Sequence, residues 1–132
     1  CISSAASDVY KRQVLNYNVN EYWVLAGAAM VLYGIKNDTP DIDLGCSKEM
    51  ADQLEKQYVP IMLPDGTRRF RIDSDVEIFE NWLSGGIQSL DGFPIVTIDG
   101  LISMKRELGR EKDFLDIARI QNYLEKQQVN CE

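Results

Sequence analysis

The sequence contains no histidine, little cysteine and no long apolar run, and each shortage excludes a class of protein. Without histidine there is no Ser–His or Cys–His catalytic pair and no usual ligand for a transition metal. The three cysteines, Cys1, Cys46 and Cys131, are odd in number and irregularly spaced, which favours reduced thiols in a cytoplasmic protein over a disulfide framework or a zinc cluster. The longest apolar stretch, residues 24–33, is far shorter than the roughly 20 residues that span a bilayer, so no membrane is expected as a partner.

Basic residues are also scarce. The chain has 14 Lys and Arg against 21 Asp and Glu, a formal net charge of −7. So few cations release little of the counterion atmosphere of DNA or RNA, which argues against non-specific nucleic-acid binding. Excess carboxylate suits a site that collects a divalent cation. Any chemistry must therefore use carboxylates, lysine, arginine, tyrosine or serine.

The 132 residues, 45% of them hydrophobic and 27% charged, are typical of one globular domain with its own core. The beginning of the chain is unusual. Residues 8–13, Asp-Val-Tyr-Lys-Arg-Gln, back-translate to GATGTGTATAAGAGACAG, a string that resembles a transposon-end adapter of DNA sequencing libraries. We expect residues 1–13 to be adapter-derived, or otherwise a disordered tail, and residues 14–132 to form a single domain.

Hydrophobic periodicity and turn residues predict a mixed α/β domain. The predicted elements are strand 21–26, helix 28–33 ending at Gly34, strand 41–46, helix 47–57 capped by Ser47, hairpin strands 69–72 and 76–79, strand 94–98, helix 100–108 capped by Asp99, and helix 112–127. Residues 60–66 are predicted as a loop or short strand, and residues 81–92 as irregular. In the last helix, Phe114, Ile117, Ile120 and Leu124 are among the residues available for the core.

Three carboxylates are the candidates for chemistry. Asp41 and Asp43 lie two residues apart in a predicted strand, so their side chains point to one face with α-carbons roughly 6.5 to 7 Å apart. Glu77, in Val-Glu-Ile-Phe, joins that face if the two strands are adjacent. Carboxylate oxygens are the ligands that Mg²⁺ prefers, and three of them suit an in-line phosphoryl transfer.

An Asp-x-Asp pair is common in proteins and by itself is weak evidence for a metal site. The residues before the pair strengthen that interpretation. A strand ends at Gly27 and a helix follows at once, which presents free backbone N–H groups to a phosphate. The segment Ala26-Gly27-Ala28-Ala29 through Gly34, followed by Thr39-Pro40-Asp41-Ile42-Asp43-Leu44, resembles the signature of minimal nucleotidyltransferases. Lys105 and the run Arg110-Glu111-Lys112-Asp113-Phe114-Leu115-Asp116 resemble the end of the same signature.

The sequence is similar to stand-alone bacterial proteins related to AbiE-type toxins and to antibiotic nucleotidyltransferases. This resemblance implies a nucleotidyltransferase-like fold, a small mixed sheet flanked by helices. It also implies that a nucleoside monophosphate moves from a nucleoside triphosphate to a hydroxyl with Mg²⁺ or Mn²⁺ as cofactor. Asp41 and Asp43 would hold the metal, and Glu77 would activate the acceptor hydroxyl or hold a second metal. The implied nucleotide-binding residues are Ala26, Gly27, Ala28, Lys105 and Lys112, and Asp113 would line the cleft with Lys112.

The sequence departs from this signature at Ala26, which stands where the family has the first glycine of a pair. An alternative is therefore a catalytically weak binding module of the same fold, such as a toxin–antitoxin component with a protein partner. The acceptor stays open between a protein, an RNA end and a small molecule, and the acidic surface favours a cationic small molecule over tRNA. A phosphatase of the haloacid-dehalogenase type is disfavoured, because Asp41 follows Asn-Asp-Thr-Pro instead of an apolar strand.

Overall fold

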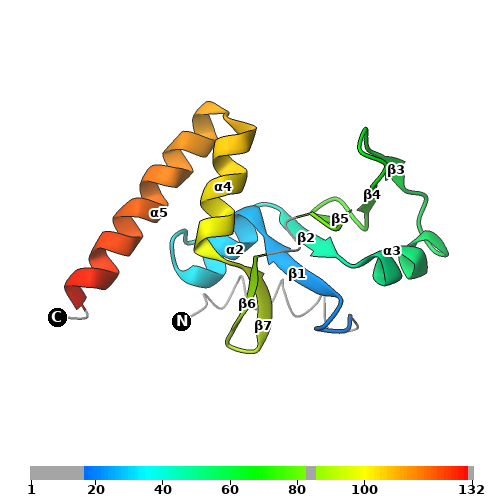
Figure 1. Cartoon of the computed structure of the whole chain (residues 1–132), viewed down its shortest axis with the longest axis horizontal. Coiled ribbons are helices and arrows are strands. Elements are labelled where there is room, and N and C mark those ends of the chain that lie inside the picture. The colour runs from blue at the N-terminus through cyan, green and yellow to red at the C-terminus, as the bar shows by residue number, and fades with distance from the viewer. Residues whose placement is uncertain (1–16, 83–85, 131–132) are drawn as a thin grey trace.

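The computed structural model describes residues 17–82 and 86–130 (Figure 1). The predicted tail at residues 1–13 lies outside these residues, as do Cys1 and Cys131. The elements are β1 (Tyr22–Leu25), α2 (Ala26–Tyr33), β2 (Ile42–Cys46), α3 (Lys48–Glu55), β3 (Ile61–Met62), β4 (Arg68–Arg71), β5 (Val76–Glu80), β6 (Ile87–Leu90), β7 (Phe93–Val96), α4 (Ile98–Leu108) and α5 (Glu111–Asn130).

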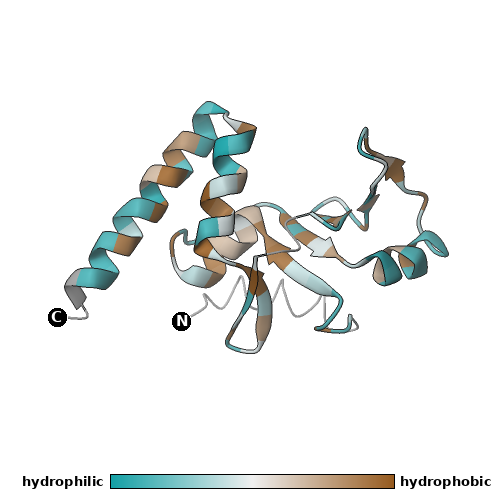
Figure 2. Cartoon of the chain, viewed as in Figure 1, coloured by the Kyte–Doolittle hydropathy of each residue, from teal (hydrophilic) through white to brown (hydrophobic). Residues whose placement is uncertain are grey.

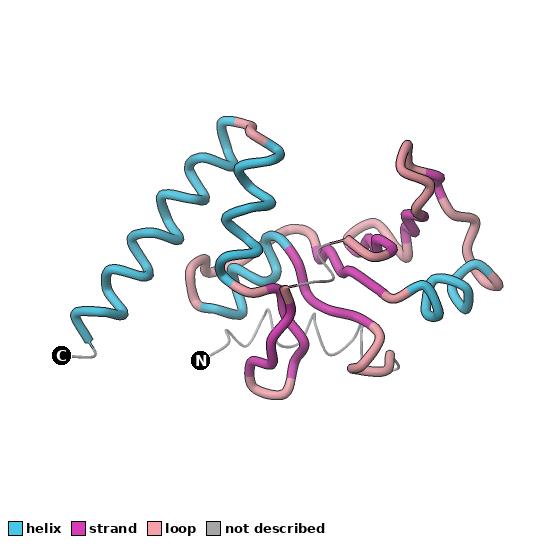
Figure 3. The backbone as a smooth tube through the Cα atoms, in the orientation of Figure 1, coloured by secondary structure: helices cyan, strands magenta, loops and turns pink. Residues whose placement is uncertain are grey.

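The strands form one mixed sheet in the order β3-β4-β5-β2-β1-β7-β6 (Figure 3). β2 pairs with β5 in parallel, and so does β1 with β7, whereas the other neighbours are antiparallel. The predicted α/β class with a mixed sheet and flanking helices is therefore confirmed. β2 and β5 are neighbours, which was the condition for Glu77 to join the two aspartates.

The two faces of the sheet differ in chemistry. Residues opposite one another in register share a face, and alternate residues of a strand point to opposite faces. Val24, Leu44 and Ile78 are completely buried on one face. The other face carries Asp43 and Glu77, which are half-buried. The polar face of β2 and β5 is thus open to a ligand while its back is the hydrophobic core.

Several boundaries differ from the prediction by one to three residues, and two helix starts differ in a way that bears on the site. α2 begins at Ala26 instead of residue 28, directly where β1 ends. α4 is capped by Thr97, whose hydroxyl accepts a hydrogen bond from the N–H of Gly100 at 3.1 Å, and not by Asp99. Asp99 lies in the first turn, where its charge favours the helix dipole without capping.

The prediction of irregular structure at residues 81–92 is wrong at residues 87–90. β6 lies there and forms a hairpin with β7, with Leu90 opposite Phe93. The two residues between the strands, Asp91 and Gly92, have φ angles of 51° and 85°. Aspartate followed by glycine is the sequence preferred for such a two-residue turn, so the signal was present in the sequence.

The long helix α5 buries only a narrow stripe. Ile117 and Ile120 are buried as predicted, but Phe114 and Leu124 are 56% and 38% exposed. α5 packs along α4 and slants away from the sheet, and Figure 2 shows apolar residues spaced along its length (Figures 1 and 2). No helix in the two described ranges is long and apolar enough to cross a membrane.

Candidate functional site

Three neighbouring strands bring a helix start and two carboxylates into one row. Leu25, the last residue of β1 and the N-cap of α2, pairs directly with Asp43 of β2. Asp43 pairs directly with Glu77 of β5. Neighbouring strands lie about 4.8 Å apart, so the row spans two strand spacings. Asp41 is exposed and immediately precedes β2, at the same end of the row.

The first turn of α2 has free N–H groups. The side chain at the N-cap is that of leucine, which accepts no hydrogen bond, and no acidic residue lies in the first turn. Uncapped N–H groups and the positive end of the helix dipole together favour a phosphate. Gly27 allows Thr39 to pack closely against the start of α2, because a Cβ atom at position 27 would lie 2.5 Å from the hydroxyl oxygen of Thr39. Thr39 in turn donates a hydrogen bond to the carbonyl of Asp41 at 3.1 Å, so the loop that carries Asp41 is held against the helix start.

The carboxyl group of Asp43 is the electrostatic centre of the site. Burial, together with the like charges of Glu77 and Asp41, raises its pKa from 3.8 to about 6. The positive charges of Lys105 and Lys112 partly oppose that rise. Four charged side chains therefore interact electrostatically with Asp43: Asp41, Glu77, Lys105 and Lys112. They had been predicted as site residues from positions far apart in the sequence.

Glu77 has a partner that the sequence did not suggest. Arg69 Nε lies 3.1 Å from Glu77 Oε2, but without the alignment of a hydrogen bond. This ion pair draws the carboxylate along the face toward β4. Within residues 17–82 and 86–130, no three acidic or cysteine side chains form a ready-made metal cage. Mg²⁺ does not need one, since it commonly takes one or two carboxylates and completes its shell with water and phosphate. The uncompensated charge around Asp43 fits such a cation.

Lys105 is held at the back of the site by a buried ionic cluster. It is 6% exposed, and its Nζ donates a hydrogen bond to Asp116 at 2.9 Å and lies 3.5 Å from Asp113. Asp116 also forms ion pairs with Lys36 at 3.1 Å and with Arg119 at 2.9 Å. The cluster joins α4, α5 and the loop after α2, and it fixes where the charge of Lys105 lies relative to Asp43.

Lys112 and Asp113, both expected along the cleft, are in different environments. Lys112 is exposed on the first turn of α5. Asp113 is completely buried and accepts hydrogen bonds from the backbone N–H and the Nε of Arg110 at 3.1 and 2.7 Å. Its role is therefore to hold the start of α5 and not to line an open cleft.

Ala26 has an unfavourable backbone conformation. Its φ angle is 53°, in the left-handed region where a Cβ atom is strained, and this is the position where the resembled family has glycine. The strained residue lies between the end of β1 and the first free N–H groups of α2. The methyl group of Ala26 therefore lowers the stability of the folded chain at this position.

We expect Ala26→Gly to stabilise the folded protein by about 0.5–1 kcal/mol, because glycine adopts a positive φ without a steric penalty. Ala28→Gly, two residues further along α2, is the matched control. There the φ angle is not positive, and glycine is expected to cost about 1 kcal/mol. Urea denaturation of the two variants measures both changes. Equal effects of the same sign would show that strain at Ala26 is not the cause.

Sequence analysis missed two contributors to the site. Arg69 lies on the open face because it is opposite Phe79 in the β4–β5 register. Asp116 was noted within the C-terminal signature, but its partners Lys36 and Lys105 are brought to it only by folding, whereas Arg119 lies three residues further along α5. The signal for Asp116 was its spacing of three residues from Asp113, which places both on one face of a helix.

No protein-family model matches this sequence, and no curated protein is significantly similar to it. Among solved structures, the chain is similar to the crystal structure of a putative nucleotidyltransferase from Thermotoga maritima. The TM-score is 0.61, and the similarity covers 93% of this chain and 96% of that chain at 16% sequence identity. The chain therefore has a nucleotidyltransferase-like fold. At this identity the similarity concerns the fold and not the substrate.

Proposed function

We propose that the chain is a Mg²⁺-dependent nucleotidyltransferase that moves a nucleoside monophosphate from a nucleoside triphosphate to a hydroxyl group. The observation that carries the proposal is the row formed by the uncapped start of α2, Asp43 and Glu77 on neighbouring strands. A triphosphate on the helix start would lie one strand away from a metal-binding carboxylate. Glu77 would lie one strand further, where the acceptor would approach.

In this mechanism the chain's own residues bind and orient the triphosphate and accept the proton of the acceptor hydroxyl. The N–H groups of the first α2 turn would hold the triphosphate, and Lys105 and Lys112 would supply positive charge beside it. Glu77 would accept the proton of the acceptor hydroxyl. The hydroxyl oxygen would form a bond to the α-phosphorus while the bond to the bridging oxygen breaks, and pyrophosphate would leave.

Asp43 and Asp41 would be the ligands of Mg²⁺ or Mn²⁺, which when bound neutralises charge that develops on the phosphate oxygens. The pKa of Asp43 is raised by burial first and by the charges of Glu77 and Asp41 after it, and a cation would offset the unfavourable negative charge that results. Glu77 would keep its position beside Arg69 in this arrangement.

The test is calorimetric titration of ATP into the full chain, with Mg²⁺ and with EDTA. We expect binding that requires Mg²⁺ and is weakened at least about tenfold in Asp43→Asn. Asp91→Asn is the matched control, because Asp91 is exposed in the β6–β7 turn and asparagine tolerates its positive φ. Binding by the other three triphosphates is measured in the same way.

If a folded protein bound none of the four triphosphates, the enzyme proposal would be wrong. A partner-binding domain of the same fold would then be the remaining explanation. Equal loss of binding in Asp43→Asn and Asp91→Asn would show that overall charge matters and the carboxylate row does not.

A further inference from the structure

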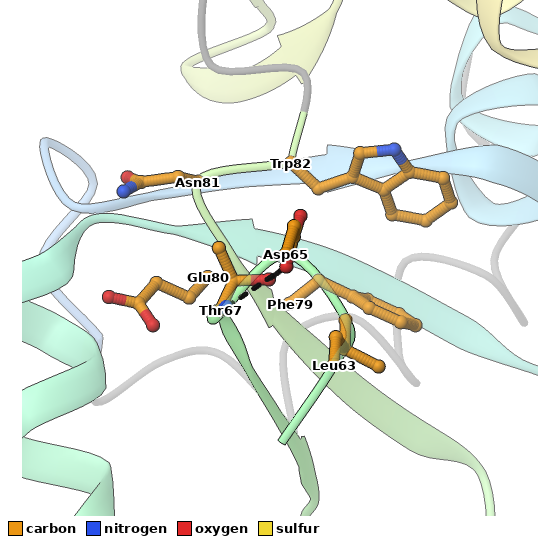
Figure 4. Close-up of a pocket in the computed structure, with 7 residues that line it drawn as sticks. All are labelled: Leu63, Asp65, Thr67, Phe79, Glu80, Asn81 and Trp82. Carbon is orange, nitrogen blue, oxygen red and sulfur yellow. Dashed lines mark hydrogen bonds between the residues drawn. The ribbon is translucent and has the colours of Figure 1, made fainter. Parts of the chain in front are cut away.

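A cavity of about 250 Å³ lies between the end of β5 and the turn that joins β3 to β4 (Figure 4). One side of it is apolar and the other is polar. The apolar side is formed by Leu63, Phe79 and Trp82, and the polar side by Asp65, Thr67, Glu80 and Asn81.

The backbone around the aromatic side is firmly held. The chain turns sharply after β5 at Asn81, whose φ angle is 57° and whose N–H donates a hydrogen bond to the carbonyl of Cys46 at 2.7 Å. The indole Nε1 of buried Trp23 donates a hydrogen bond to the carbonyl of Trp82 at 2.7 Å. Gly45 makes room for that indole, because a Cβ atom there would overlap it. These contacts hold the backbone of Asn81 and Trp82 against β2 and β1.

The two rings form an angled corner. The ring centroids of Phe79 and Trp82 are 4.9 Å apart, and the planes are inclined by 58°. Both rings are only partly buried, so ring surface remains available to a ligand. A third planar ring packs favourably against such a corner in an offset or edge-to-face arrangement.

The corner formed by Phe79 and Trp82 lies near Glu77, the carboxylate proposed to accept the proton of the acceptor hydroxyl. Phe79 follows Glu77 by two residues in β5, so the two side chains share a face with α-carbons roughly 7 Å apart. Arg69, which is opposite Phe79 in register, draws the Glu77 carboxylate toward the same side. The start of α2 lies on the opposite side of the row, beyond β2.

We propose that this cavity takes a planar ring of the acceptor and so presents a hydroxyl on a short arm to Glu77. The inference rests on the proposed function and names the class of its acceptor. In an in-line transfer the acceptor and the leaving group lie on opposite sides of the reacting phosphorus. β5, which carries Glu77 and Phe79, is separated by β2 from β1 and the start of α2. The volume of the cavity suits one ring system, since an engineered cavity of about 150 Å³ binds benzene.

The test compares two alcohols of matched size, 2-phenylethanol with a planar ring and 2-cyclohexylethanol with a puckered one. Each is titrated into the full chain and followed by tryptophan fluorescence, because one of the two tryptophans is Trp82 at the cavity. We expect 2-phenylethanol to bind about three- to tenfold more tightly than 2-cyclohexylethanol.

Phe79→Leu is the decisive variant, since it keeps apolar volume and removes a ring face. We expect it to abolish the preference for the planar alcohol and to leave Mg²⁺-dependent ATP binding unchanged. Phe114→Leu is the matched control, because Phe114 is exposed on α5 away from the cavity. Trp82→Leu, followed by calorimetry, repeats the test if Phe79→Leu does not fold.

Three results would overturn the inference. Equal affinity for both alcohols would exclude a planar-ring site, and so would an unchanged preference in Phe79→Leu. Parallel loss of Mg²⁺-ATP binding in Phe79→Leu would assign the cavity to the nucleobase instead of the acceptor. Absence of Mg²⁺-ATP binding in the unmodified chain would instead overturn the proposed function, and with it the acceptor role.

Discussion

Asp43→Asn is expected to make the folded protein more stable at pH 7, by between about 1 and 3 kcal/mol in the presence of EDTA. The pKa of Asp43 is about 6 in the folded chain, against 3.8 for an unperturbed aspartate. One pKa unit corresponds to about 1.4 kcal/mol, and partial exposure reduces the full value. Asparagine removes a charge that burial, Glu77 and Asp41 make unfavourable.

This gain has a defined pH dependence. A raised folded pKa contributes stability that is fully present below the unfolded pKa near 3.8 and is lost as the pH rises through about 6. The unmodified protein and Asp43→Asn should therefore be nearly equal in stability at pH 4, with the variant ahead above pH 6. Urea denaturation at several pH values measures the difference.

Asp91→Asn is the control for this series and should show no such slope, because Asp91 is exposed. An Asp43→Asn variant that is less stable at pH 7, or a gain that does not change with pH, would contradict the prediction. A destabilising residue kept in a fold is typical of sites where charge serves binding.

The candidate site was largely predictable because it depends on strand alternation. Asp43 and Glu77 were placed on polar faces by their apolar neighbours, and that local pattern survives folding. Their direct pairing was not predictable, because it requires β2 and β5 to be parallel neighbours although the 29 residues 47–75 separate them in the chain. The same holds for Arg69, which meets Glu77 only through the β4–β5 register.

The fold was less predictable where tertiary packing decides. The apolar stripe of α5 is wider in the sequence than the part that α4 covers, so Phe114 was expected in the core and is exposed. The hairpin of β6 and β7 was missed even though Asp91 and Gly92 form its turn. Three of the four residues of β6 are exposed, which leaves it without the alternating apolar pattern of a half-buried strand.

Asp116→Asn is expected to have the opposite effect to Asp43→Asn and to destabilise the protein by about 3 kcal/mol. Asp116 is 4% exposed and accepts charge from Lys105, Lys36 and Arg119. Burial alone would raise its pKa, but the hydrogen bonds and charges of Lys105 and Lys36 outweigh burial and lower it. Neutralising the aspartate leaves buried Lys105 with only the longer contact to Asp113.

The pH dependence is also reversed. A lowered folded pKa contributes stability that is present above the unfolded pKa and is lost as the pH falls through the folded value. The penalty of Asp116→Asn should thus persist at pH 4, where the gain of Asp43→Asn has vanished. Urea denaturation measures it, with Glu111→Gln on the exposed first turn of α5 as a control expected to change stability by no more than about 0.5 kcal/mol.

Lys105→Met separates two roles of the ionic cluster around Asp116: stabilising α5 and lowering the pKa of Asp43. It removes the buried cation but leaves Asp116 with Lys36 and Arg119, so its cost should be smaller than that of Asp116→Asn. Since the charge of Lys105 lowers the pKa of Asp43, its removal should move that pKa further upward, which NMR titration of the Asp43 carboxyl measures. An unchanged Asp43 pKa in Lys105→Met would show that the cluster only stabilises α5, because a lysine that serves the carboxylate row must act on Asp43.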